Sequence, residues 1–291
     1  MKKWKTTKFA TLEITTSIPI KGCTVNCVFC PQQILLNSYN SERYLSLDNF
    51  FKVIDKIPKE IRISFAGFAE PWLNKNCTEM LLYAHTTGHP ITVFTTGIGM
   101  NIDDIDKIKN IPYNLGPNGG FALHLPDNEN YGKHPINNKY IEVLEKLKEL
   151  QSEIQGFYLI TMGTVHNKIR HIFPYADIPQ MWSRAGNLIK EISLKPDLLN
   201  VKDKFKSIYH GEFKLTCNCD EKLYHNVLLP NGDISLCCMD YNLEHILGNL
   251  FTQEYENIIP NPLECFNLCK FCENGIKIKN ETPKMITVKI V

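Results

Sequence analysis

Three cysteines near the N-terminus constrain this chain more than any other feature. Cys23, Cys27 and Cys30 are separated by three and then two residues, in the stretch Cys-Thr-Val-Asn-Cys-Val-Phe-Cys-Pro. A loop with this spacing can fold around one corner of a 4Fe–4S cluster and give a thiolate to three of its four irons. The fourth iron would then have no protein ligand and could bind a substrate or a cofactor.

The other cysteines are spread unevenly along the chain. Of 11 in total, seven lie between residues 217 and 272, Cys77 stands alone, and residues 78–216 contain none. In a reducing compartment such cysteines are more typical of metal ligands than of disulfides. We therefore expect a cytoplasmic protein with two metal centres on either side of a cysteine-free body.

Charge and hydropathy narrow the range of partners. The formal net charge of +1 gives no electrostatic reason to expect nucleic acid or a membrane surface. No apolar run approaches the roughly 18 residues that span a bilayer. The basic start, residues 1–5, is not followed by the apolar segment of a signal peptide.

The body of the chain alternates between expected strands and expected helices. Five segments resemble buried strands, and a sixth is weakly marked: 9–16, 61–66, 91–96, 120–124, 157–161 and 182–186. Helices are expected after Ser46, after a capping box of Asn76 and Glu79 that opens a helix running to Gly88, around Ile105, and around Leu144. Six βα units in about 190 residues fit an incomplete barrel better than the closed eight-unit form. The expected fold class is α/β, a partial (β/α)6 TIM-like barrel over residues 1–194.

The C-terminal part has a different character. Residues 195–216 form a lysine-rich stretch that we interpret as a linker, and 217–291 as a small cluster domain with a tail. Segments 224–229 and 233–237 flank Pro230-Asn231-Gly232, which is a strong hairpin signal. A short helix is expected at 252–259.

The cysteine loop resembles the cluster motif of the radical S-adenosylmethionine (radical SAM) enzymes, with the aromatic Phe29 before the last cysteine. After the second expected strand, Gly67-Phe-Ala-Glu70-Pro71 resembles the Gly-Glu-Pro segment of that family, with Ala69 where glycine is usual. Thr95-Thr96-Gly97 resembles its Thr-Asn-Gly. The resemblance implies that the three thiolates hold a cluster whose open iron is chelated by S-adenosylmethionine. It also implies that these residues contact that cofactor: Phe29, Gly67, Glu70, Pro71, Thr95 and Thr96.

The C-terminal cysteines resemble the twitch type of auxiliary cluster domain, which is the shortened form of the SPASM domain. The resemblance implies that four thiolates ligate a second 4Fe–4S cluster: Cys219, Cys237, Cys269 and Cys272. Cys217 could take the place of Cys219. A tetrahedral zinc site is the rival interpretation, because four cysteines also suit zinc.

Candidates for contact with a substrate lie near the expected strand ends: His124, Asp127, His166 and Arg184. Ser183-Arg-Ala-Gly186 is similar to a short stretch in the dehydrogenases of aminocyclitol biosynthesis that carry a twitch domain. That similarity makes Arg184 the favoured candidate of the four. Cys238 adjoins the ligand Cys237, and its thiol could return a hydrogen atom to a substrate radical.

The resemblance therefore implies a radical SAM oxidoreductase, with the auxiliary cluster favouring net oxidation of a small polar substrate such as a cyclitol or sugar. Expected partners are that small molecule and an external electron donor of the flavodoxin or ferredoxin type, with the oligomeric state left open. Epimerisation with Cys238 as hydrogen donor is one alternative, and modification of a peptide or protein side chain is another. A binding protein stabilised by two zinc ions is the alternative that involves no catalysis.

Overall fold

The structure is a computed structural model and describes residues 11–115, 119–179, 184–188, 225–258 and 266–272. Its strands are β1 (Thr11–Ile14), β2 (Arg62–Phe65), β3 (Ile91–Thr95), β4 (Phe121–His124), β5 (Phe157–Ile160), β6 (His225–Leu228), β7 (Asp233–Ser235) and β8 (Ile246–Asn249). Its helices are α1 (Gln32–Ser38), α2 (Leu47–Ile54), α3 (Cys77–Thr86), α4 (Ile102–Ile108) and α5 (Asn138–Glu149). Three short 3₁₀ helices are η1 (Pro71–Leu73), η3 (Tyr255–Asn257) and η4 (Asn267–Phe271).

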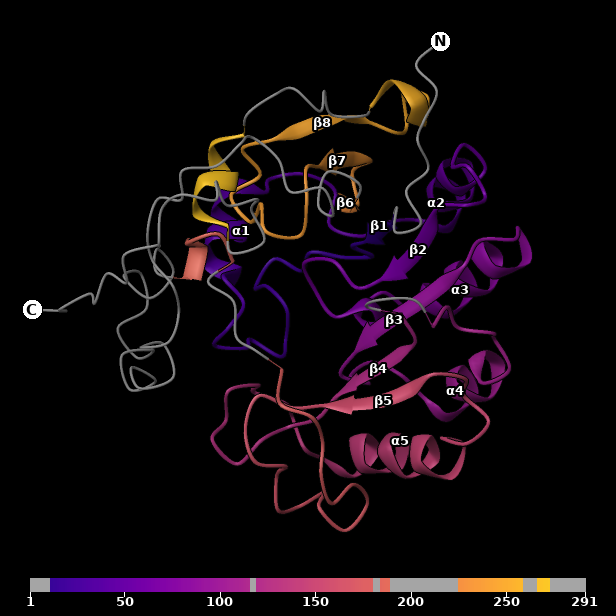
Figure 1. Ribbon diagram of the computed structural model, residues 1–291, viewed down its shortest axis with the longest axis vertical. Coiled ribbons are helices and arrows are strands. Elements are labelled where there is room, and N and C mark those ends of the chain that lie inside the picture. Colours follow the sequence, from indigo (N-terminus) through magenta and orange to yellow (C-terminus); the bar gives the residue numbers. More distant parts are fainter. Residues whose placement is uncertain (1–10, 116–118, 180–183, 189–224, 259–265, 273–291) are drawn as a thin grey trace, which may run out of the picture.

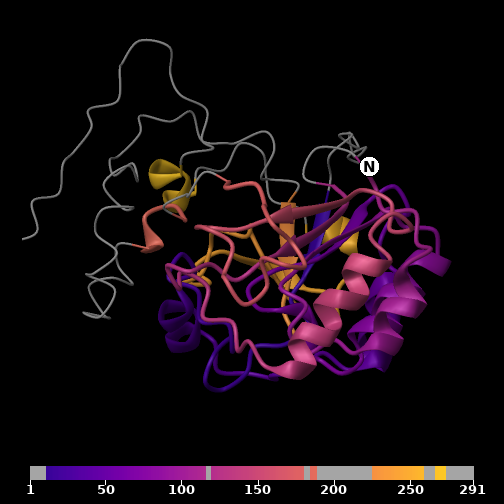
Figure 2. The ribbon, with the colours of Figure 1, turned by 90° about the horizontal axis from the view of Figure 1, so that it is seen from below.

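The strands form one sheet in the order β5-β4-β3-β2-β1-β6-β7-β8. Strands β1 to β6 pair in parallel, whereas β7 and β8 continue the sheet as antiparallel strands. The helices α2 to α5 lie along the outer side of the parallel strands (Figure 1), and the perpendicular view in Figure 2 shows them on one side of the sheet. The expected partial barrel with a C-terminal hairpin is confirmed.

The alternation along the strands separates an apolar outer face from a polar inner face. Leu12 and Ile14 of β1 belong to the main core, which packs against the helices. Thr11 and Glu13 alternate with these two residues along β1. They line the inner side of the barrel, together with Arg62 and Ser64 of β2. Successive side chains of a strand point to opposite faces, so the barrel interior is lined with polar groups near its centre.

The caps of two helices differ from the expected pattern. Ser46 caps α2 as expected, since its side chain accepts from the backbone N of Asn49. The capping box expected at Asn76 and Glu79 is wrong, because Asn76 has a turn-like backbone and its side chain makes no capping hydrogen bond. The helix α3 also ends at Thr86, before Gly88. A capping box forms instead at Asn101, which opens α4.

The sixth strand is not where the sequence predicts it. Arg184 and Ala185 have φ values of 55° and 53°, in the left-handed region that a strand cannot use. Asp177 supplies a single parallel bridge to β5 instead, donating its N–H to Leu159 O at 3.0 Å and accepting from Thr161 N at 2.9 Å. The helix expected at 252–259 is only the 3₁₀ turn η3, and β8 had no alternating pattern that would predict it. Within the described ranges no helix is long and apolar enough to cross a membrane.

Candidate active site

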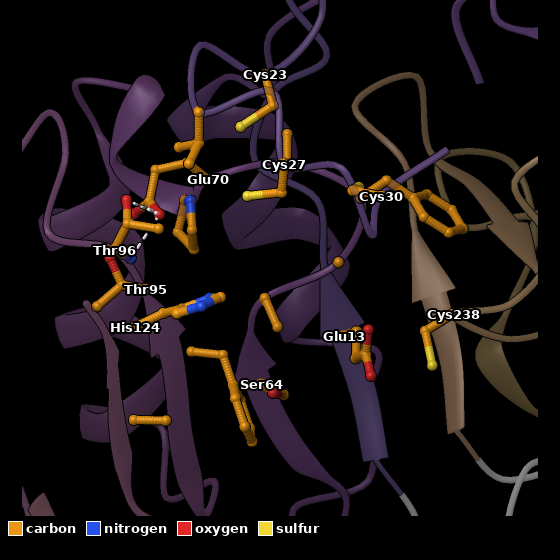
Figure 3. A pocket seen from close by; sticks show the side chains of 18 of the residues that line it. Glu13, Cys23, Cys27, Cys30, Ser64, Glu70, Thr95, Thr96, His124 and Cys238 are labelled. Carbon is orange, nitrogen blue, oxygen red and sulfur yellow. Dashed lines mark hydrogen bonds between the residues drawn. The ribbon is translucent and has the colours of Figure 1, made fainter. Parts of the chain in front are cut away.

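One cavity of about 520 Å³ opens between the cysteine loop, the inner face of β1 to β6, and the turn after β7. Figure 3 shows side chains from all three regions pointing into it. Cys23, Cys27 and Cys30 line the cavity together with Arg184 and Cys238. Residues from both ends of the chain therefore meet at one site.

Short turns and one glutamine hold the cysteine loop. Asn26 N donates to Cys23 O and Cys30 N to Cys27 O, each at 3.1 Å, so one turn starts at Cys23 and the next joins Cys27 to Cys30. The side chain of Gln32 receives the Cys23 N–H on Oε1 at 3.0 Å. Its Nε2 donates to Phe68 O at 2.7 Å and lies 3.1 Å from Cys30 Sγ. Gln32 thus fastens the loop to the segment after β2.

The three thiols influence one another electrostatically. Burial, together with the negative charges of Cys30 and Cys23, raises the pKa of the Cys27 thiol well above its ordinary value. Burial likewise raises the pKa of Cys23 to about 12. Thiolates in this space therefore need a positive partner to neutralise them.

A cluster with one open iron fits this loop. Nowhere in the described ranges is a group of three or more His, Cys, Asp and Glu side chains arranged to hold a metal ion. A 4Fe–4S cluster takes each thiolate through a different iron, so its ligands spread around a larger group. Three thiols that face one cavity from a single loop meet that requirement.

Glu70, after β2, lies in a network of hydrogen bonds from the end of β3. It accepts from Thr95 Oγ1 and, at 2.7 Å each, from the N and Oγ1 of Thr96. Burial raises the pKa of this carboxyl to about 6, although the hydrogen bonds from Thr95 and Thr96 oppose the shift. Both segments that resemble the family's cofactor motifs therefore meet at one carboxylate, and contact with the methionyl amine stays a prediction.

The turn before Glu70 requires one glycine. Gly67 has φ of 73°, and a Cβ there would stand 2.2 Å from Thr15 Oγ1 and 3.0 Å from the Thr15 backbone. Thr15 Oγ1 accepts the N–H of Phe68 at 3.1 Å, so this turn packs directly on the end of β1. Ala69 is not among the residues of positive φ, and alanine is therefore accommodated where the family has glycine. Pro71 follows as the first residue of η1.

His124 and Phe29 form the wall of the cavity opposite Cys238. Their rings lie 5.3 Å apart, and Figure 3 shows His124 at the cavity. Burial and the charges of His134 and Arg184 lower the pKa of His124 to about 3, so its imidazole is neutral. Its Nε2 is buried and makes no hydrogen bond within the described residues.

Two other sequence candidates lie away from the cavity. Asp127 is buried and accepts from the backbone N–H groups of Tyr131 and Gly132 at 2.9 and 3.1 Å, closing the loop after β4. His166 is half-buried in a later loop, where its Nδ1 accepts from Lys168 N. Of the four substrate candidates the structure brings His124 and Arg184 to the cavity, but not these two.

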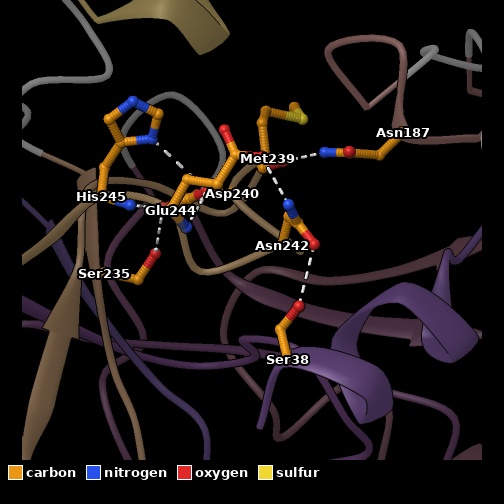
Figure 4. A network of polar contacts seen from close by, with 8 residues as sticks. All are labelled: Ser38, Asn187, Ser235, Met239, Asp240, Asn242, Glu244 and His245. Carbon is orange, nitrogen blue, oxygen red and sulfur yellow. Dashed lines mark hydrogen bonds and ion pairs between the residues drawn. The ribbon is translucent and has the colours of Figure 1, made fainter.

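Arg184 is positioned by a link to the C-terminal hairpin. The turn that carries it closes through Asn187 N, which donates to Arg184 O at 3.2 Å. The side chain of Asn187 then donates to Met239 O at 2.8 Å, as Figure 4 shows. Burial opposes the charge of the guanidinium, but the nearby charges of Tyr241, Cys238, Cys30 and Glu13 raise the pKa of Arg184 above its ordinary value.

A buried aspartate shapes the turn after Cys238. Asp240 is 1% exposed, and its Oδ2 accepts from Ser235 Oγ at 3.3 Å and from His245 N at 2.9 Å (Figure 4). Ser38, at the end of α1, donates to Asn242 Oδ1 at 2.8 Å. These bonds fix the segment that presents Cys238 against the cysteine loop.

The structure describes three of the four cysteines that are expected at the auxiliary centre. Cys237 and Cys272 are buried in one cluster, with Cys269 packed against it. Burial and the negative charges of Cys272 and Asp240 raise the pKa of Cys269 to about 11. Cys219 and its alternative Cys217 lie outside the described residues. Three thiols gathered by a hairpin and the turn of η4 fit a second cluster, and the role of each stays a prediction.

Sequence reasoning missed several polar residues of the cavity, among them Glu13, His225 and Tyr241. Glu13 could have been found, since it alternates with Leu12 and Ile14 in β1 and must face the opposite side. His225 and Tyr241 had no comparable signal, because the pairing of β6 with β1 brings His225 to the cavity and the turn after β7 brings Tyr241.

Comparison with known families agrees with this arrangement. A model described as the radical SAM superfamily matches residues 17–171, which is more than half of the chain. A model described as an iron–sulfur cluster-binding domain, SPASM, matches residues 217–277. No curated protein matches the sequence.

Several solved structures share the fold at low sequence identity. BtrN in complex with AdoMet and 2-DOIA has a TM-score of 0.57 and 14% identity, over 96% of this chain and 98% of that one. Native anSMEcpe with bound AdoMet and Cp18Cys peptide has a TM-score of 0.52 and 11% identity, over 94% and 92%. Streptococcus suis SuiB bound to precursor peptide SuiA has a TM-score of 0.51 and 14% identity, over 91% and 70%.

Proposed function

The chain belongs to the radical SAM superfamily, and from this premise we propose that it oxidises a carbinol of a small polar molecule, such as a cyclitol or sugar, to a carbonyl. The enzyme binds S-adenosylmethionine and a 4Fe–4S cluster, and its SPASM segment binds an auxiliary iron–sulfur cluster. When bound, these groups supply a deoxyadenosyl radical that abstracts hydrogen and an acceptor for one electron. The side chains that line the cavity perform the remaining steps.

The observation that carries the proposal is the composition of this one cavity. Its wall includes Cys23, Cys27 and Cys30 on one side and Cys238, next to the auxiliary ligand Cys237, on the other. Its size falls in the range of about 300–1,000 Å³ that is usual for small-molecule sites. A substrate between the two centres could lose a hydrogen atom to one side and an electron to the other.

Arg184 supports a substrate that carries oxygen. Its guanidinium borders the cavity, where nearby side chains, Glu13 among them, favour its charged form. A guanidinium donates hydrogen bonds from N–H groups in a fixed planar geometry. It therefore stabilises an oxygen that gains negative charge as its proton leaves. We assign it to the hydroxyl that becomes the carbonyl.

Epimerisation is a second candidate, favoured by the position of Cys238. This half-buried cysteine lines the same cavity as the three loop cysteines. A thiol there could give its hydrogen atom back to a substrate radical, which inverts a centre without net oxidation. Peptide modification is a third, because anSMEcpe and SuiB have peptides bound in their solved structures, although a likeness at this identity carries the fold alone.

A substrate panel tests the proposal against both alternatives. Holoenzyme with both clusters is reduced anaerobically with dithionite and incubated with S-adenosylmethionine and one of three probes: scyllo-inositol, 2-deoxy-scyllo-inosamine, or a short cysteine-containing peptide. We expect deoxyadenosine together with a carbonyl product from a polyol, trapped as its hydrazone and identified by mass spectrometry. Incorporation of solvent deuterium at carbon, lost in Cys238→Ala, would establish epimerisation instead, and a peptide product would overturn the small-molecule proposal.

The partners follow from the same chemistry. A flavodoxin- or ferredoxin-like protein would supply the electron that starts each turnover. A cytoplasmic location suits free thiols that must stay reduced to hold clusters. Loss of product formation when such a donor replaces dithionite would contradict the first of these assignments.

A further inference from the structure

A carboxylate and an imidazole face the same cavity from neighbouring strands. Glu13 lies in β1 and His225 begins β6, and the parallel register pairs His225 with Thr11, two residues before Glu13. His225 Nε2 lies 2.8 Å from Glu13 Oε1. Figure 3 shows the Glu13 carboxylate inside the cavity, below the three cysteines and between Ser64 and Cys238 in that view.

Stability alone does not explain this pair. The side chains of Glu13 and His225 are only 10% and 17% exposed, so both groups have lost most of their water. In many proteins the free energy lost when two charged groups leave water exceeds the free energy gained from their contact. A pair of apolar side chains of similar volume would stabilise the fold at least as well. Polar pairs that line a cavity are therefore more typical of a functional site than of a core.

The groups around Glu13 form an arrangement suited to proton transfer from a hydroxyl. The Arg184 guanidinium lies close enough to Glu13 for their charges to interact, and both border the cavity. A hydroxyl held between a guanidinium and a carboxylate has a donor for its oxygen and an acceptor for its proton. Arg62 lines the same cavity, where its Nε donates to Thr11 Oγ1 at 3.0 Å and its Nη1 to Asn114 Oδ1 at 3.4 Å.

We infer that Glu13 is the general base that takes the hydroxyl proton of the substrate, with His225 as the residue that positions its carboxylate. This inference rests on the proposed function. In the balanced step, the carbon-bound hydrogen leaves as an atom to the cofactor-derived radical, and the O–H bond breaks with its proton passing to a carboxylate oxygen of Glu13. The remaining electron passes to the auxiliary iron–sulfur cluster, so that C–OH becomes C=O.

The two residues have separate tasks in this step. His225 donates through Nε2 to Oε1 of Glu13 and positions the carboxylate, and the carboxylate receives the proton. Arg184 stabilises the oxygen as the proton departs. Proton transfer by a positioned group contributes roughly 10²- to 10⁴-fold to a rate.

The test separates hydrogen abstraction from deprotonation. Holoenzymes carrying Glu13→Gln, Glu13→Asp or His225→Gln are compared with wild type on the panel polyol, deuterated at carbon. We expect Glu13→Gln to lower carbonyl product at least about 100-fold, while deuterium transfer into deoxyadenosine changes by no more than about twofold. A substrate-derived organic radical should then accumulate in electron paramagnetic resonance spectra. Glu13→Asp should recover part of the product yield, and His225→Gln should lose less than Glu13→Gln.

Two controls keep the outcome decisive. Glu142→Gln removes an exposed carboxylate on α5 and should leave every readout unchanged. Calorimetric titration of the polyol into the unreduced holoenzyme measures affinity apart from turnover, and Glu13→Gln should leave it within about threefold. A parallel fall in product, deuterium transfer and affinity would show a binding or structural role and overturn the inference. Full product yield from Glu13→Gln would also overturn it, whereas no carbonyl product from wild type would remove the proposed function and this inference with it.

Discussion

The phenol oxygen of Tyr241 lies 3.3 Å from Cys30 Sγ, although 211 residues separate the two in sequence. Tyr241 belongs to the turn after the C-terminal hairpin strand β7, and its ring packs on Phe68 with centroids 4.8 Å apart. The C-terminal segment therefore directly contacts Cys30, one of the three cysteines predicted to hold the N-terminal cluster. This contact joins the C-terminal segment to the N-terminal cysteine loop.

Removing this hydroxyl should lower the reduction potential of the N-terminal cluster. A hydrogen bond to a ligating sulfur stabilises the more negative, reduced cluster, so Tyr241→Phe should shift the potential downward by on the order of tens of millivolts. A redox titration followed by electron paramagnetic resonance measures the shift. Tyr255→Phe, in the core near η3, is the matched control and should have no effect. An unchanged potential in Tyr241→Phe would show that the contact does not reach the cluster.

Loss of one auxiliary ligand should separate the two stages of the reaction. Cys237→Ala should reduce iron from about eight to about four atoms per chain and leave cleavage of S-adenosylmethionine intact. Carbonyl product should disappear, because the substrate radical has no electron acceptor. Iron analysis and deoxyadenosine assays check both points, with Cys77→Ala in the core as the control. Retained oxidation in Cys237→Ala would contradict the role of the second cluster.

The bond between Asn187 and Met239 should matter more for stability than the bond between Ser38 and Asn242. Asn187→Ala removes the side-chain donor to the Met239 carbonyl, which still accepts the N–H of Tyr241 at 3.0 Å, and should lower the free energy of unfolding by about 1 kcal/mol. Ser38→Ala removes a hydrogen bond on the exposed surface and should cost less than about 0.5 kcal/mol. Urea unfolding of both variants under anaerobic conditions measures the difference. Equal losses would mean that the Arg184 turn is not held by this link.

Acid should destabilise the fold in part through His124. The pKa of this group is lowered to about 3, whereas an unfolded histidine binds a proton below about pH 6.5. Between about pH 6.5 and pH 3 the unfolded state therefore binds a proton at His124 that the folded state does not bind. The free energy of unfolding falls as the pH drops through this range.

At about pH 5 the loss should be about 1 kcal/mol, less than full burial would give because the ring also borders the cavity. His124→Asn should remove this part of the pH dependence between about pH 7 and 5. Denaturant titrations at the two pH values measure it, with His85→Asn on α3 as the control. A pH dependence that His124→Asn leaves intact would assign the acid sensitivity to other groups.

The sequence predicted the features whose residues are close together along the chain. Cys23, Cys27 and Cys30 sit on one loop of consecutive turns, so their spacing alone indicates how they can share a cluster. Glu70 and the pair Thr95-Thr96 follow neighbouring parallel strands, and the carboxyl ends of such strands meet at one edge. The alternation of strands and helices predicted the partial barrel for the same local reason.

The errors arose where local pattern and backbone conformation disagree. The segment at 182–186 was expected as a strand, but Arg184 and Ala185 adopt left-handed backbone conformations that only the surrounding contacts impose. Asn76 and Glu79 have the spacing of a capping box, yet Asn76 has φ of −91° and ψ of 5° instead of the extended backbone of a capping residue. Spacing indicates which bonds are possible, and the neighbouring element decides which ones form.

By itself, the sequence determined the cysteine loop, the carboxylate after β2 and the order of strands and helices, because each depends on residues within one or two turns. The tertiary structure alone decided what surrounds the cavity. Parallel pairing of β6 with β1 brings His225 to Glu13, and the turn after β7 brings Tyr241 to Cys30. The periodicity of the sequence does not indicate these partners, since β1 and β6 are separated by about two hundred residues and pair only when the whole sheet assembles.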